Sequence, residues 1–179
     1  MERTLFHPRR GEFLLVSKTD AHQVVRATDD WPAICHTRQL LLDTVSQSLG
    51  AVIEHGFTPL QERGSRVCRA GSALRIRHLL DARIAELEPS ERHRVELMCG
   101  LVYAPTLLFV EEPPLHSRER VATAFRRFQA EFGVTTLWAT YDPEPLLPLA
   151  DRMLVFEAGG VRIWDVPHYQ PLGDLACGR

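Results

Sequence analysis

The stretch LEPSERHRVELMCGLVYAPTLLFVEEP, residues 87–113, contains a helix pattern followed directly by a strand pattern. Ser90 after Pro89 is typical of a helix N-cap. Pro105 interrupts the helix, residues 106–110 form an apolar strand, and the strand ends in Glu111 and Glu112. The apolar positions that we expect the helix to bury are Val95, Met98, Leu101 and Val102. A helix feeding a buried strand that ends in carboxylates is typical of an α/β fold.

The composition limits the class of protein. The chain has 179 residues and a formal net charge of −2, with an isoelectric point near 6.4. This balance argues against a nucleic-acid-binding protein, which usually carries a clustered basic surface. No apolar run reaches the ~20 residues that cross a bilayer, so we expect a cytoplasmic protein that meets a membrane only through partners. The four cysteines are too widely spaced for a zinc site or a disulfide framework: Cys35, Cys68, Cys99 and Cys177.

The N-terminal half predicts two strands and several helical stretches. Residues 12–16 and 31–36 are short apolar runs typical of buried strands. Apolar residues recur at helical spacing over 40–52 and again over 73–86. Residues 58–71 between them are mostly polar and predict a loop.

The C-terminal half predicts a helix, a strand and a hairpin. Residues 117–132 form an amphipathic helix that stops at Gly133, and residues 134–139 follow as a strand. Residues 144–150 form a short helical link, and residues 153–156 and 161–164 form a β-hairpin. Strands alternating with helices predict a parallel sheet flanked by helices.

Residues 87–95 match, without a gap, the signature L-S-G-G-[EQ]-x-x-R-V of ATP-binding cassette (ABC) ATPases, although most polar positions differ. Residues 132–142 and 149–156 resemble two further segments of this family, in the same order. The resemblance implies an ABC-type, P-loop NTPase-like α/β fold with a C-terminal hairpin. It also implies one truncated domain over residues 1–179, with a small helical subdomain at about 40–88.

A phosphate-binding (Walker A) loop, which the resemblance leads us to expect after the first strand, is not recognisable in this sequence. Such a loop reads Gly-x-x-x-x-Gly-Lys-[Ser/Thr], because glycine-permitted amides must surround the phosphates. After the first strand this chain reads Ser17, Lys18, Thr19 and then Asp20. We interpret the first three residues as a doubtful nucleotide-binding remnant, and Asp20 as unfavourable to a polyphosphate.

The strand-end and switch positions are altered too. In the family an Asp holds Mg²⁺ through water and the next Glu polarises the attacking water. Glu111 replaces that Asp, while Glu112 matches the general base. Tyr141 replaces the switch histidine, and a phenol cannot act as that sensor at neutral pH. We expect no metal site, although two adjacent carboxylates leave weak divalent-ion binding open.

The signature frame is Leu87, Glu88, Pro89, Ser90 and Glu91. In the family its serine hydroxyl and glycine amides contact the γ-phosphate held by the opposite subunit. Here Glu88 takes the serine position and Pro89 takes a glycine position, where it removes an N–H.

The loop that reads the opposite subunit in the family is represented by Ser117 and Arg118, with Arg118 in place of an aspartate. Gln39 is the nearest candidate for the glutamine expected after the second strand, at a spacing several residues too short.

These replacements favour a catalytically degenerate subunit, a pseudo-ATPase that assembles with or regulates an ABC transporter. Its implied partners are a membrane subunit, an active ABC ATPase subunit, or both, at the inner face of the cell membrane. The sequences of residues 91–97 and 137–142 are similar to those of exporter-type subunits. Neither a cofactor nor ATPase activity is expected. Two alternatives stay open: residual ATP binding or hydrolysis with ATP and Mg²⁺, and an adaptor or ligand sensor unrelated to transport.

Overall fold

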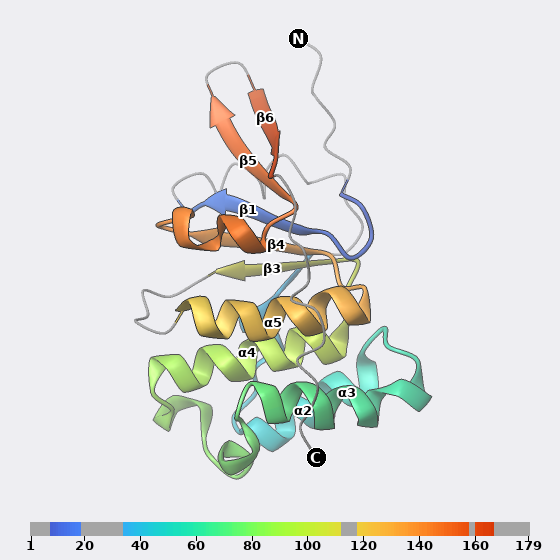
Figure 1. Ribbon diagram of the computed structural model, residues 1–179. Coiled ribbons are helices and arrows are strands. Elements are labelled where there is room, and N and C mark those ends of the chain that lie inside the picture. The colour runs from blue at the N-terminus through green and yellow to red at the C-terminus, as the bar shows by residue number, and fades with distance from the viewer. Residues whose placement is uncertain (1–7, 19–33, 112–117, 158–159, 167–179) are drawn as a thin grey trace, which may run out of the picture.

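The computed structural model describes residues 8–18, 34–111, 118–157 and 160–166. These residues form a six-stranded sheet in the order β2-β3-β4-β1-β5-β6 (Figure 1). Five strands are parallel, and β6 pairs antiparallel with β5. The strands are β1 (Phe13–Ser17), β2 (Ile34–His36), β3 (Leu107–Glu111), β4 (Thr136–Thr140), β5 (Arg152–Glu157) and β6 (Gly160–Asp165). The predicted α/β fold with a C-terminal hairpin is therefore confirmed.

The central strands are buried on both faces, as their continuous apolar runs predict. On β1, Phe13 and Leu15 face the main core, while Leu14 and Val16 belong to a second apolar layer. The main core continues through Trp138 on β4, whose ring lies 5.6 Å from that of Phe13. The alternation of side chains along β1 thus supplies both layers.

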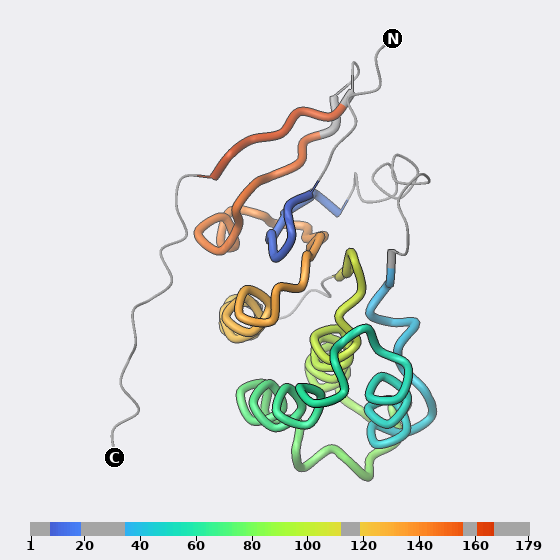
Figure 2. The backbone as a smooth tube through the Cα atoms, turned by 90° about the vertical axis from the view of Figure 1, so that its right-hand side faces the viewer, coloured from blue at the N-terminus to red at the C-terminus, as the bar shows by residue number. Residues whose placement is uncertain are grey.

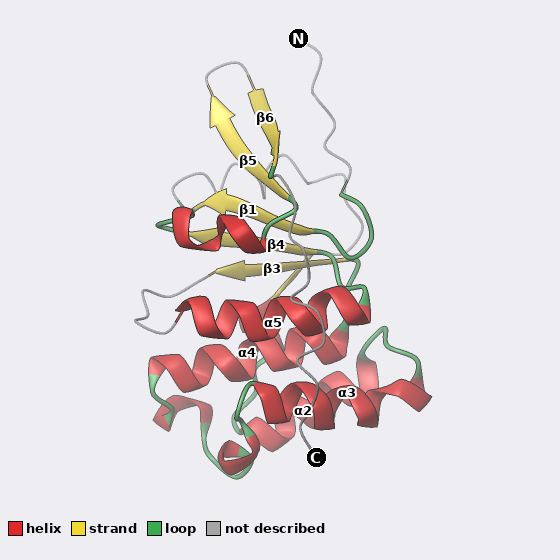
Figure 3. Cartoon of the chain, in the orientation of Figure 1, coloured by secondary structure: helices red, strands yellow, loops and turns green. Residues whose placement is uncertain are grey.

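Four helices make up the helical layer: α2 (Val45–His55), α3 (Leu60–Ala73), α4 (Pro89–Tyr103) and α5 (Arg118–Phe132). They lie together on one side of the sheet (Figure 3). Figure 2 shows α2, α3 and α4 gathered away from the β5–β6 hairpin. Helix α4 contacts the other three helices, and its buried residues include all four that the sequence predicts.

Partly buried ion pairs connect the start of β1, α5 and the start of β5. Arg126 on α5 donates to Asp151 at 2.8 Å and to the carbonyl of Leu149 at 3.0 Å. The backbone N–H of Phe13 donates to the same Asp151 carboxylate at 2.6 Å. Glu12 accepts from Arg152 at 2.6 Å, and this hydrogen bond is the main reason that the pKa of Arg152 is raised.

The polar loop predicted over 58–71 is wrong, because most of it is the helix α3. The inner face of α3 consists of Arg66, Ala70 and Gly71 rather than large apolar residues. The guanidinium of Arg66 lies 4.6 Å from the ring centroid of Phe132 on α5. The long aliphatic stem of an arginine covers apolar surface as an aliphatic residue would. A segment that reads as polar in the sequence is therefore an amphipathic helix.

The helical stretch predicted over 73–86 is also wrong in form. Leu74, Ile76, Leu79 and Ile84 are buried and Leu80 is exposed. The backbone makes two 3-10 turns, Arg77–Leu79 and Ile84–Glu86. Arg75 adopts φ 53°, a left-handed conformation that ends the preceding helix. The short link after Asp142 is helical as predicted, as the 3-10 helix Glu144–Leu149, and Gly133 ends α5 with φ 65°.

Candidate nucleotide site

The strand ends bring several of the predicted residues to one edge of the sheet. Ser17 at the end of β1 is the register partner of Thr140, and Glu111 at the end of β3 is the partner of Ala139. The arrowheads of β1 and β3 point the same way in Figure 1. The carboxyl edge of a parallel sheet is the usual place for a ligand site. Thr19, Glu112 and Ser117 lie outside the described residues.

Lys18 and Tyr141 meet at this edge. The backbone N–H of Lys18 donates to the carbonyl of Thr140 at 2.7 Å. The Nζ of Lys18 lies 4.7 Å from the ring centroid of Tyr141, which is 64% exposed. This is cation–π geometry. The structure thus places Lys18 against Tyr141, the two residues predicted as a nucleotide-binding remnant and a switch position.

Glu111 forms an ion pair that the sequence did not predict. Its Oε2 lies 3.1 Å from Nη1 of Arg38, which follows β2 in a 3-10 helix (Thr37–Leu40). Both residues line a pocket of about 200 Å³ together with His36 and Gln39. The only sequence signal for this ion pair was a basic residue just after β2, the strand that neighbours β3. The guanidinium of Arg38 thus offsets the charge of the Glu111 carboxylate.

The Cys35 thiol on β2 is expected to stay protonated at neutral pH. Burial raises the pKa of Cys35 on β2 to about 11, and its Sγ lies 3.7 Å from the carbonyl oxygen of His36. The thiolate, rather than the thiol, is the nucleophile and the metal ligand. No group of three metal-ligating side chains occurs in the part of the chain that the structure describes.

The signature-equivalent residues form the start of α4. The helix begins at Pro89 with Glu88 as N-cap. Ser90, the predicted N-cap, is instead the second residue of the helix. Proline suits the first helical position because its φ is preset and its missing N–H has no helical partner there. The Glu91 carboxylate accepts from the backbone N–H of Glu88 at 3.2 Å. Two carboxylates therefore stand at the positive end of the helix.

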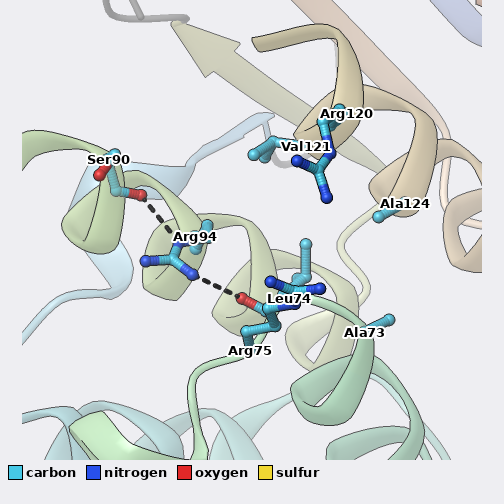
Figure 4. Close-up of a pocket in the computed structure, with 8 residues that line it drawn as sticks. All are labelled: Ala73, Leu74, Arg75, Ser90, Arg94, Arg120, Val121 and Ala124. Carbon is cyan, nitrogen blue, oxygen red and sulfur yellow. Dashed lines mark hydrogen bonds between the residues drawn. The ribbon is translucent and has the colours of Figure 1, made fainter. Parts of the chain in front are cut away.

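A basic pocket of about 390 Å³ adjoins this helix start (Figure 4). Arg94 donates to the carbonyl of Ser90 at 3.2 Å and to that of Leu74 at 3.4 Å. Arg75 and Arg120 line the same pocket. Arg94 thus links the signature-equivalent turn to the segment after α3. Arg118, the altered position of the predicted loop, begins α5.

Solved structures with a similar arrangement include ABC transporter proteins. A bacterial ABC transporter cassette with a dimeric structure superimposes with a TM-score of 0.67 at 15% identity, covering 92% of this chain and 89% of the cassette. CbiO1 from Clostridium perfringens, part of the ABC transporter complex cbiONQ, gives 0.66 at 21% identity, covering 90% and 80%. The chain has the ABC cassette fold.

Sequence comparison finds ABC cassette homologues. The import ATP-binding protein UgpC 3 of Agrobacterium fabrum, for sn-glycerol-3-phosphate, is 28% identical over 128 residues, covering 69% of this chain. The sulfate/thiosulfate import ATP-binding protein CysA 2 of Chromobacterium violaceum is 30% identical over 128 residues, covering 64%. The spermidine/putrescine import protein PotA of Ruegeria pomeroyi is 27% identical over 123 residues, covering 66%.

The match covers only part of those relatives. It spans 36% of UgpC 3, 34% of PotA and 33% of CysA 2. No protein-family model matches the chain. Within the described ranges, no helix is both long and apolar enough to cross a membrane.

Proposed function

We propose that this chain is a non-hydrolysing ABC-type subunit that assembles with, or regulates, an ABC transporter. The start of α4 carries the proposal. Where ABC proteins present a serine hydroxyl and glycine amides to a γ-phosphate, this chain presents Glu88, Pro89 and Glu91. The Glu91 carboxylate already accepts from the backbone N–H of Glu88. A triphosphate brought to this turn would meet like charge in a poorly solvated interface.

The ion pair at the sheet edge supports the same proposal. Arg38 holds the Glu111 carboxylate at 3.1 Å, so magnesium would have to displace a guanidinium. The pair is 53% and 32% exposed, and an exposed pair contributes at most about 1 kcal/mol. The pair therefore disfavours metal binding without blocking it, and the turn at Glu88 remains the stronger argument.

The transporter part of the proposal rests on the relatives. They are import ATP-binding proteins, which favours an importer over the exporter-type complex suggested by residues 91–97 and 137–142. We further propose that residues 1–179 are one truncated cassette domain, whose helical part near 40–88 docks on a membrane subunit or beside an active ATPase subunit. This places the chain at the inner face of the membrane only through its partners.

Calorimetry with ATP and Mg²⁺ tests the nucleotide part. We expect no saturable heat with the 179-residue chain, whereas binding in the micromolar range would refute it. Glu112→Gln is the parallel sample, because removing the general base traps ATP in a competent site. If the wild type released phosphate from ATP and Glu112→Gln did not, the alternative of residual hydrolysis would replace our proposal.

Co-expression tests the transporter part separately. The chain is produced with the ABC membrane and ATPase subunits encoded by neighbouring genes, and the extract is resolved by gel filtration. We expect a stoichiometric complex. Elution of the chain alone, with the partners assembled without it, would instead favour an adaptor or ligand sensor outside transport.

A further inference from the structure

A second pocket lies at the opposite end of the sheet from the strand ends discussed above. It has a volume of about 430 Å³ and is lined by residues that precede β3 and β4, by the end of α5 and by the α2–α3 turn. Pro105 and Thr106 come just before β3, and Thr135 comes just before β4. This amino edge is the side from which β3 starts in Figure 1, away from its arrowhead. A volume in this range suits a small organic ligand.

The walls of the pocket combine polar and apolar surface, and the aromatic part is held in place. Phe57 and Phe132 line it, and Phe57 is 63% exposed although its ring lies edge-on to Tyr103 at 5.4 Å. The backbone N–H of Phe57 donates to the carbonyl of Tyr103 at 2.7 Å. The next residue, Thr58, donates its hydroxyl to the carbonyl of Val102 at 2.5 Å. The exposed ring therefore stands on a turn fixed to the end of α4.

The charge in the pocket is positive. Arg10 and Arg66 line it, and no carboxylate is among the lining residues in the described part of the chain. Arg66 is only 8% exposed and stacks on Phe132. Its Nη2 donates to Glu62 at 2.9 Å, but its Nη1 is buried and meets no acceptor among the described residues. Leaving a buried charged donor without an acceptor is costly, so an acceptor in the pocket would stabilise Arg66 once a shift of its side chain exposed Nη1.

Arg10 supplies a second, accessible cation. It lies on the exposed surface, and its guanidinium passes close to Gly133, where an added Cβ would be 3.5 Å from Nε. Because Glu62 already balances Arg66, the pocket carries about one unit of uncompensated positive charge. A monoanion with a flat apolar body matches that charge and the two aromatic walls better than a phosphate dianion, whose desolvation is costlier.

We propose that the pocket formed by Arg10, Arg66, Phe57 and Phe132 binds a small organic monocarboxylate with an aromatic or similarly flat apolar body. The carboxylate lies between the two guanidinium groups, and the body lies against the phenyl rings. This site is independent of the nucleotide edge and of the proposed transporter role.

Ligand titration followed by ¹⁵N NMR of the full chain tests the site, with 3-phenylpropionate as the probe. We expect saturable shifts in residues 57–59, 104–106 and 133–135, with a Kd on the order of 1 mM for a fragment of this size. The neutral analogue 3-phenylpropan-1-ol should bind at least about tenfold more weakly, since it lacks the charged acceptor. Equal binding of the alcohol, or no saturable shift, would overturn the proposal.

Two variants locate the site without disturbing the core. Arg10→Ala and Phe57→Ala change exposed side chains, and each should weaken 3-phenylpropionate by about tenfold. Arg77→Ala, an exposed arginine in a distant 3-10 turn, is the control and should leave binding unchanged. Unaltered affinity in both test variants would refute the proposed site, as would shifts confined to Ser17, Glu111 and Tyr141. If an acidic aromatic peptide bound and 3-phenylpropionate did not, the pocket would be assigned to a protein partner. That result would overturn the small-ligand proposal.

Discussion

Gly100 on α4 packs directly against Leu108 on β3, and its replacement by alanine should destabilise the protein. A Cβ at this position would lie 2.6 Å from Cδ2 and 2.9 Å from Cδ1 of Leu108. Leu108 is fully buried, so it cannot swing into solvent. Overpacking of this kind costs about 1–3 kcal/mol, whereas alanine gains about 0.5–1 kcal/mol over glycine within a helix. We expect a net loss of about 1 kcal/mol in the free energy of unfolding.

Gly64 on α3 is the matched control. An added Cβ meets nothing within 4 Å there, so Gly64→Ala should keep the helical gain of about 0.5–1 kcal/mol without the packing cost. Urea unfolding followed by tryptophan fluorescence measures both variants, because Trp138 is buried in the core. If Gly100→Ala proved as stable as Gly64→Ala, the packing argument for the α4–β3 contact would fail.

Three further predictions concern the core, a helix start and the thiols. Arg126→Met should lower the unfolding free energy by about 1–3 kcal/mol, because it leaves the partly buried Asp151 carboxylate and the Leu149 carbonyl without a donor. The exposed neighbour Arg127→Met should change it by less than about 0.5 kcal/mol, and equal losses in urea melts would count against the network. Thr44 accepts from the backbone N–H three residues on at 3.2 Å, so Thr44→Ala should cost about 1 kcal/mol, and Thr44→Ser should recover most of that loss. Burial raises the pKa of Cys99 to about 12, so at pH 8 about one thiol in ten thousand is ionised; mass spectrometry should find exposed Cys68 alkylated first, and simultaneous labelling of Cys99 would contradict the burial.

The fold was predictable because its strands are short continuous apolar runs between clear breaks. The helix α5 was equally clear, with aromatic residues on one face and Gly133 at its end. What the sequence hid was α3, whose inner face uses Arg66 in place of an aliphatic residue. Hydrophobic periodicity cannot detect a helix that buries a guanidinium against a ring.

The candidate site was predictable only position by position. The sequence placed Glu111 and Tyr141 at strand ends, and parallel pairing brings such ends together whatever the side chains are. The ion pair with Arg38 was not predictable, because it depends on β2 lying beside β3 and on the turn that follows. The error at Ser90 is local, since a proline at the first helical position moves the N-cap back by two residues, to Glu88.

The position of β1 in the sheet has a consequence for how the chain is made. Its neighbours are β4 and β5, and Leu14 pairs in register with Leu137 and Arg152. At usual rates of synthesis those partners emerge roughly ten seconds after β1 leaves the ribosome. Until then an apolar strand has no native pairing on either side. We expect nascent chains that stop before Arg152 to aggregate or recruit chaperones, whereas release of the finished chain lets the centre of the sheet close in one late step.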